Sequence, residues 1–360
     1  MKCLGRAAIG GALGLALLAV SCRAPAAAVN PGSTAADDPA LAEAEEPALA
    51  WRVVEADAVV ALEADRALLF ELRFGADEDE PAIHPLGLPG GDSLTRDRPA
   101  DHPWHHGLWF AWKFIDGVNY WEHGPEGRPV GRTSWDQPLL GVGGDGTARA
   151  LLRVTYAHAS AGEANPRVRL IEERELVVHP PSADGTWTMD WTSTFQAAAG
   201  VVTLDRTPLL GEPGGKVFGG YGGLSVRLAQ VEERTVASEH GPVAFSAESR
   251  ARPRAMALDY AGRPGSVAAS EGTTEALAGI AVLEHPSNPR LADGGRAWYA
   301  IRSDAMTFFT PAVLTEGPLV VEPGQPLRLA WRIVVHPGAW DPGRLALEAE
   351  RFAAGQPMPR

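Results

Sequence analysis

The residues best suited to chemistry are concentrated between His84 and His123, a stretch that holds five of the chain's ten histidines and four of its eleven tryptophans. An imidazole titrates near neutral pH, so these residues could carry protons or bind a metal ion. The densest group is Asp101-His-Pro-Trp-His-His106. We expect a functional site here, on the loop that precedes an apolar strand at Leu108–Phe114.

Acid–base chemistry on a sugar is the first function that these residue types fit, because a sugar offers apolar CH faces to aromatic rings and hydroxyls to polar groups. In this interpretation Asp101 orients the histidines, Arg96 binds an oxygen, and Trp104 or Trp109 stacks on the ring. An isomerase, a lyase or a hydrolase would each use such a set. The expected catalytic residues are His84, Asp101, His102, His105 and His106.

A metal site is the second interpretation. His102, His105 and His106 could converge in a turn, and His84 or a carboxylate would complete a shell for copper, zinc or iron in an oxygenase-type enzyme. The chain contains no HExxH motif, so the sequence specifies no cofactor and leaves a divalent metal as an alternative. A third interpretation is a non-catalytic glycan-binding surface, or a polar network that only stabilises the edge of a sheet.

Two other segments are candidates for substrate binding. The tract from Gly211 to Gly223 holds seven glycines in thirteen residues. It lacks the spacing of a P-loop, so it is either a flexible connection or a binding loop that uses Glu212, Lys216 or Tyr221. The second segment directly follows a predicted strand at Ile280–Leu283, and it offers His285, Asn288 and Arg290.

The elements that must position these residues are mostly strands. Apolar residues alternate with polar ones in many short segments, which is typical of strands with one buried face. Gly and Pro separate the segments at the intervals of turns. Because only Pro342–Ala354 has helical spacing, we predict an all-β fold, a large antiparallel β-sandwich. The predicted strands are Ala67–Phe74, Ala148–Ala157, Val168–Val178, Thr186–Phe195, Leu224–Leu228, Ile280–Leu283, Ala297–Ile301 and Leu327–Val335.

The amino-terminal region is predicted to be a targeting segment. Residues 1–21 combine early positive charge with a short apolar run, as a signal peptide does. Cys22 follows in the position that a bacterial lipoprotein would lipidate, so we expect an exported protein that is periplasmic or anchored in the outer membrane. Residues 22–50 are rich in Ala, Pro, Glu and Asp and are expected to be a flexible tether. Residues 51–360 would then form a single domain.

The net charge of −13 and the lack of a basic run argue against nucleic acid as a partner. The expected partners are a small-molecule or oligosaccharide ligand and, through the lipid anchor, a membrane.

Five motifs together resemble the bacterial PmoA-like family, labelled methane oxygenase PmoA. They extend over most of the chain, from about Ala67 to Gly338. The resemblance implies a soluble β-rich domain of the kind found among sugar-utilisation proteins, and it implies no particular reaction. One departure is Trp104, which stands where the family usually has a polar residue. The motifs are His84-Pro-Leu, Thr95-Arg96, Asp101-His-Pro-Trp-His-His-Gly-Leu-Trp109, Gly219-Gly-Tyr-Gly-Gly-Leu-Ser225 and Glu284-His-Pro-Ser-Asn-Pro-Arg290.

The strand-rich pattern with a histidine-lined site also looks like the aldose epimerase superfamily of large sandwiches. In that superfamily a histidine and a carboxylate interconvert the anomers of a sugar. The likeness concerns the fold and says little about activity.

Overall fold

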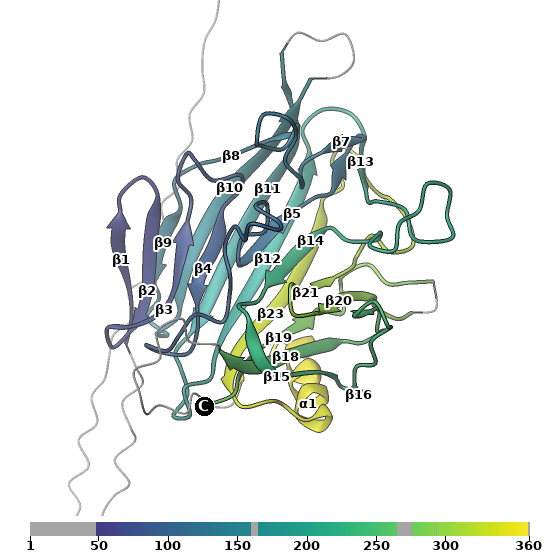
Figure 1. Cartoon of the computed structure of the whole chain (residues 1–360). Coiled ribbons are helices and arrows are strands. Elements are labelled where there is room, and N and C mark those ends of the chain that lie inside the picture. Colours follow the sequence, from purple (N-terminus) through teal and green to yellow (C-terminus); the bar gives the residue numbers. More distant parts are fainter. Residues whose placement is uncertain (1–47, 160–164, 265–275, 293, 359–360) are drawn as a thin grey trace, which may run out of the picture. The chain divides into compact units, whose positions relative to one another are not determined.

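The computed structural model describes residues 48–159, 165–264, 276–292 and 294–358. The segment 45–360 forms one compact unit, shown in Figure 1. Within the described ranges, no helix is long and apolar enough to cross a membrane. The predicted signal peptide, Cys22 and nearly all of the predicted tether lie outside the described residues, so the division of the chain into these parts stays a prediction.

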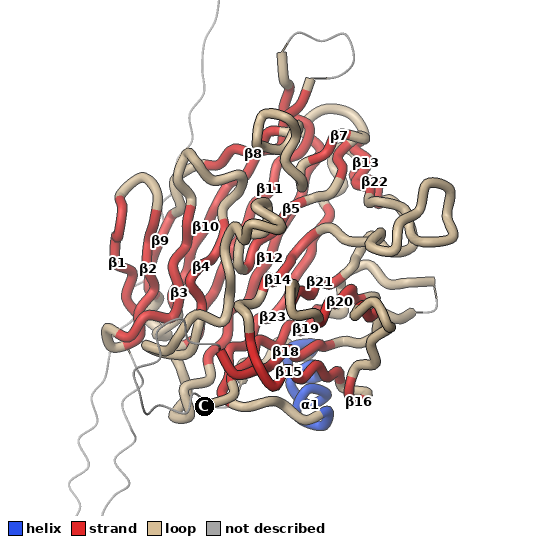
Figure 2. The backbone as a smooth tube through the Cα atoms, in the orientation of Figure 1, coloured by secondary structure: helices blue, strands red, loops and turns tan. Residues whose placement is uncertain are grey.

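The described chain is almost entirely antiparallel β-structure with one helix, which confirms the predicted fold class (Figure 2). The first sheet has the strand order β1-β2-β3-β4-β5-β14-β21-β20-β17. Its strands are β1 (Leu49–Glu55), β2 (Val59–Ala64), β3 (Ala67–Arg73), β4 (Ala82–Leu86), β5 (Leu108–Ala111), β14 (Gly223–Arg227), β21 (Thr307–Pro311), β20 (Trp298–Arg302) and β17 (Arg250–Ala251).

The second sheet has the order β16-β15-β18-β19-β23-β12-β11-β10-β8, and β9 also pairs with β10. Its strands are β16 (Gly241–Pro242), β15 (Val231–Ser238), β18 (Ala257–Pro264), β19 (Ala278–Glu284), β23 (Leu327–Pro337), β12 (Trp187–Ala197), β11 (Arg167–His179), β10 (Ala148–His158), β8 (Arg132–Trp135) and β9 (Leu139–Val142). A small third sheet contains β22 (Leu319–Val321), β13 (Val202–Asp205), β6 (Phe114–Ile115) and β7 (Val118–Asn119).

The eight strands predicted from alternation are present with small differences at their ends. The apolar strand predicted at Leu108–Phe114 is wrong in its extent, because β5 ends at Ala111 and Phe114 begins β6 in a different sheet. In β12, Trp187, Met189, Trp191 and Phe195 are buried as the period-two pattern predicts. The predicted helix is α1 (Pro342–Ala353), which begins where the Asp341 side chain accepts a hydrogen bond from the Arg344 backbone N–H at 3.0 Å. Such a cap satisfies one of the free N–H groups of the first turn.

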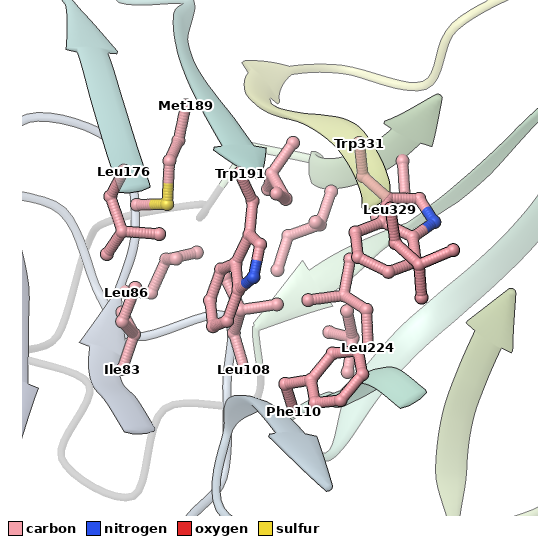
Figure 3. Close-up of a cluster of buried hydrophobic side chains, with 14 of the residues drawn as sticks. Ile83, Leu86, Leu108, Phe110, Leu176, Met189, Trp191, Leu224, Leu329 and Trp331 are labelled. Atoms are coloured by element: carbon pink, nitrogen blue, oxygen red, sulfur yellow. The ribbon is translucent and has the colours of Figure 1, made fainter. Parts of the chain in front are cut away.

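The core lies between the two large sheets. Figure 3 shows Ile83, Leu108, Phe110 and Leu224 of the first sheet together with Leu176, Met189, Trp191, Leu329 and Trp331 of the second. Phe110 lies 5.2 Å from Phe195 and 5.9 Å from Trp331, measured between ring centroids. Helix α1 packs on the other face of the second sheet, through Leu345, Ala349 and Phe352.

The first sheet has a second apolar layer on its outer face. Trp109 of β5, Tyr299 of β20 and Phe308 of β21 belong to this layer, and all three are buried. Because successive residues of a strand point to opposite faces, Trp109 faces this layer while Phe110 faces the core. Both faces of β5 are therefore covered, and the candidate functional site lies on the outer face.

Candidate functional site

A cleft of about 240 Å³ lies over the outer layer of the first sheet. It is formed by the loop before β5, the segment after β7, the Gly-rich loop before β14, and strands β17, β20 and β21. At about 30 Å³ per water molecule, the space can hold one small ring. The lining residues are His102, Trp104, His105, Trp121, Glu122, Phe218, Tyr221, Arg250, Tyr299, Ile301, Met306 and Phe308.

A tight turn places two of the predicted histidines in the cleft. The His105 backbone N–H donates to the carbonyl of His102 at 3.0 Å, and the two imidazoles stack with centroids 4.7 Å apart. The chain then leaves the turn through Gly107, whose φ of +68° favours glycine. A side chain at Gly107 would also place its Cβ 2.6 Å from the carbonyl oxygen of Ile83.

His102 is oriented by a carboxylate. Its Nδ1 lies 2.8 Å from Oδ2 of Asp101, which also accepts from Nη2 of the buried Arg227 at 3.0 Å. Partial burial would raise the pKa of Asp101, but the hydrogen bond from His102 and the charge of Arg227 outweigh it and lower that pKa. An ionised carboxylate only accepts, so His102 donates through Nδ1. A neutral His102 then keeps Nε2 as a free acceptor.

His105 is a different kind of histidine. Its ring is buried between His102 and Phe308, whose centroid is 5.3 Å away, and its Nδ1 has no hydrogen-bond partner among the described residues. Burial, reinforced by repulsion from nearby cationic groups, lowers the pKa of His105 well below its ordinary value. His105 is therefore a neutral wall of the cleft, with one polar atom left unpaired.

Glu122 is the second functional group of the cleft, and three donors hold it. Its Oε2 accepts from the Nζ of Lys113 and from Nδ2 of Asn119 at 2.6 Å, and its Oε1 accepts from the Tyr221 hydroxyl at 2.7 Å. Burial lowers the pKa of Lys113 to about 7. Asn119 also accepts from the backbone N–H of Glu122 and of Trp121, which fixes the turn after β7.

Aromatic rings form much of the remaining wall. Trp104 meets His102 edge to face at 5.4 Å, and Trp121 packs against Tyr221 at 5.1 Å. Trp109 does not line the cleft but supports it from below, 5.2 Å from the ring of His105. Trp109 therefore belongs to the buried layer and not to the predicted stacking platform.

His106, the third histidine of the Asp101–His106 segment, points away from the cleft. His106 is fully buried, with Nδ1 3.3 Å from Asp97 and Nε2 3.6 Å from Asp79. Burial alone would lower the pKa of His106, but Asp79 and Asp97 raise it to about 10, so it is a charged structural group. His84 is also apart from the cleft, with Nδ1 bonded to the Thr95 hydroxyl at 3.0 Å.

The expected convergence of His102, His105 and His106 on a metal ion is therefore wrong, because consecutive residues of the chain send His105 and His106 in different directions. In the part of the chain that the structure describes, no group of three His, Cys, Asp or Glu side chains has a geometry suited to a metal ion.

The other residues predicted to bind substrate also lie in separate parts of the structure. Glu212 accepts from Arg206 at 2.7 Å and holds a turn of the Gly-rich loop. Of that loop's candidates Glu212, Lys216 and Tyr221, Tyr221 lines the cleft and the other two do not. His285 lies against Phe352 of α1 at 5.2 Å. Asn288 bonds both backbone groups of Ala330, which is a structural role. Arg96 does not line the cleft, and Arg290 lines a separate hollow beside Glu284 and Arg296.

Several cleft residues were not among those predicted to be catalytic or to bind substrate. Glu122 and Trp121 lie inside the histidine-rich stretch, and their place in that stretch is the sequence feature that indicates them as site residues. Arg250, Tyr299 and Phe308 come from separate strands without a motif, and nothing local in the sequence marked them. The structure thus keeps Asp101, His102, Trp104, His105 and Tyr221 together and adds partners from distant strands.

The model of the family described as "Family of unknown function (DUF6807)" matches residues 59–350. The chain belongs to the DUF6807 family. This match overturns the resemblance to the PmoA-like family, which finds no support. A comparison with curated proteins gave no match.

Two solved structures are similar to this DUF6807 protein at a low level. A galactose mutarotase-like protein from Clostridium acetobutylicum has 8% identity and a TM-score of 0.31, and the match covers 82% of this chain and 99% of the other. A putative aldose 1-epimerase from Klebsiella pneumoniae subsp. pneumoniae has 12% identity and a TM-score of 0.30, with 84% and 82% covered. Likenesses this weak carry no argument about the activity of the DUF6807 protein.

Proposed function

We propose that this DUF6807 protein binds a single sugar ring or sugar derivative in the cleft and transfers protons to and from it. The observation that carries the proposal is one cleft holding a carboxylate-oriented histidine, a second fixed carboxylate and several aromatic rings. Aromatic faces match the CH faces of a sugar, and the polar groups match its hydroxyls. Enclosure of the ring would also exclude water from the polar contacts.

His102 is the proposed proton carrier. Because Asp101 holds Nδ1, the free Nε2 would accept a proton from a ligand hydroxyl and return it in a later step. Glu122 is the proposed fixed acceptor for a second hydroxyl, with its orientation set by Tyr221, Asn119 and Lys113. Trp104 and Trp121 would hold the ring between these two groups.

The test is a panel of common monosaccharides, followed for binding by saturation-transfer NMR and for conversion of the bound sugar by one-dimensional NMR. We expect His102→Gln to lower the turnover of an accepted sugar by about 10²–10⁴-fold, the usual contribution of a positioned acid or base. Trp104→Ala should weaken binding, because it removes an aromatic wall. The matched control is His285→Gln, which changes a histidine outside the cleft and should leave both unchanged.

The outcomes separate an enzyme from a binding module. Binding without conversion, lost in Trp104→Ala and kept in His102→Gln, would support a non-catalytic glycan-binding protein instead. Equal effects of His102→Gln and His285→Gln would argue against the cleft as the site.

We also propose that the protein is exported and held at a membrane by lipid on Cys22. This proposal rests on the sequence before Cys22 and not on the fold.

A further inference from the structure

One end of the cleft carries positive charge that no carboxylate of the described residues neutralises through an ion pair. Arg250 of the edge strand β17 lines the cleft and pairs, through its backbone, with Ile301 of β20. Its Nη1 donates to the carbonyl of Glu248 at 3.2 Å, whereas its Nε is buried without a hydrogen-bond partner. The Nε of Arg250 is therefore a buried donor at the cleft that a ligand could bond. It points to a negative group on the ligand.

A buried hydroxyl lies in the same part of the cleft. Tyr299 is 1% exposed and lines the cleft, and its hydroxyl has no hydrogen-bond partner in the part of the chain that the structure describes. Buried polar groups are nearly always bonded, so an exception at a cleft indicates a place for a ligand atom. The hydroxyl can donate to an acceptor that enters beside it.

A second guanidinium strengthens the positive field around Tyr299. The Arg252 guanidinium lies 4.4 Å from the centroid of the Tyr299 ring, and its Nη2 donates to the carbonyl of Gly219 at 2.5 Å. Burial and repulsion from Arg250 both lower the pKa of Arg252. Two like charges are thus held close together around one hydroxyl, an arrangement that an anion would stabilise.

The negatively charged side chains in and beside the cleft already have positively charged or hydrogen-bonding partners. Glu122 is paired with Lys113, and Asp101 is bonded to both His102 and Arg227. An anionic group that enters beside Arg250 meets the attraction of Arg250 and Arg252, which the nearby exposed carboxylate of Glu248 reduces.

We propose that the ligand of the cleft is a sugar acid, whose carboxylate is bound by Arg250 and by the hydroxyl of Tyr299. This inference rests on the proposed function and names the substrate class for the same cleft. A guanidinium presents parallel N–H donors that match the two oxygens of a carboxylate. Arg250 and Tyr299 together can donate to both oxygens of a carboxylate, and the phosphorylated probe in the test distinguishes a carboxylate from a phosphate.

The test is isothermal titration calorimetry of the full chain with matched probes: glucuronate against glucose, galacturonate against galactose, and glucose 1-phosphate as the phosphorylated arm. We expect at least one uronate to bind about tenfold or more tightly than its neutral partner, since hydrogen bonds to charged groups are the stronger ones. Arg250→Gln should weaken uronate binding by about 10- to 100-fold and leave neutral sugars within about twofold. Tyr299→Phe should lower uronate affinity by a smaller factor.

Two further variants serve as controls. Arg250→Lys keeps the charge and should retain part of the preference. Arg149→Gln removes one positive charge from an exposed site outside the cleft and should change nothing. Unchanged melting temperatures would show that each variant folds.

Each other outcome overturns the inference. Equal binding of uronates and neutral sugars, with both lost in Trp104→Ala, would refute the sugar acid and leave the proposed function standing. A uronate preference that survives Arg250→Gln would refute the assigned residues, and tighter binding of glucose 1-phosphate would refute the carboxylate. If none of the three ligand classes binds, the proposed function and this inference fail together.

Discussion

Replacement of His106 by glutamine tests the separation of the histidines into a structural group and a functional group. His106 is fully buried, and its two nitrogens lie 3.3 Å from Asp97 and 3.6 Å from Asp79, with Glu80 at 3.9 Å. His106→Gln keeps a polar side chain but removes the positive charge that these carboxylates surround. Loss of one partner of a buried ion pair commonly costs about 3–5 kcal/mol.

The same magnitude follows from the pKa of His106, which the carboxylates raise from 6.5 to about 10. Each pKa unit corresponds to about 1.4 kcal/mol, so the shift corresponds to on the order of 5 kcal/mol. Because the folded-state pKa is raised, this stabilisation is fully present below pH 6.5 and is lost as the pH rises towards about 10. The difference between the wild type and the variant should narrow across that window.

The measurement is urea denaturation of both proteins at pH 7 and at pH 10. We expect the free energy of unfolding of His106→Gln to lie about 3–5 kcal/mol below the wild type at pH 7 and roughly 1 kcal/mol below it at pH 10. His240→Gln, at an exposed histidine, should change the free energy of unfolding by less than about 0.5 kcal/mol. The reasoning would be refuted by no loss at pH 7, or by an equal loss at both pH values.

Three further predictions follow from local structure. Gly107→Ala should lower the free energy of unfolding by about 2 kcal/mol or more, because φ is +68° and the new Cβ would lie 2.6 Å from the carbonyl of Ile83; a urea midpoint equal to the wild type would contradict this. Asp341→Ala should cost about 1 kcal/mol through loss of the cap on the Arg344 N–H, measured by thermal unfolding, with an unchanged transition as the contrary result. Cys22→Ser should move the protein from the membrane fraction to the soluble fraction and remove a lipid mass, and a wild type without lipid would disprove the anchor.

The fold class could be predicted from the sequence because strand periodicity is a local property. In β12 the alternation of large apolar and polar residues specifies which side chains are buried before any partner strand is known. The helix α1 could be predicted in the same way, because Leu345, Ala349 and Phe352 are spaced to lie on one side of a helix.

Part of the candidate site could also be predicted from the local sequence. His102, Trp104 and His105 lie within one turn, so their closeness needs only a few backbone hydrogen bonds. Their count and spacing therefore gave a valid guide to the position of the cleft. The same count led to a wrong role for His106, because adjacent residues leave the backbone in different directions. The role of each histidine depends on the carboxylates that surround its side chain.

The amino-acid sequence by itself determined the all-β class, the strand positions and the turn that carries His102 and His105. Only the tertiary structure decided which distant residues join them, because β5 pairs with β14, β14 with β21, and β21 with β20, an order unrelated to the order along the chain. This order depends on how the two sheets bury their inner faces together, a property of the whole core that no local motif encodes. It brings Tyr299 to the cleft and leaves His285, Asn288 and Arg290 outside it.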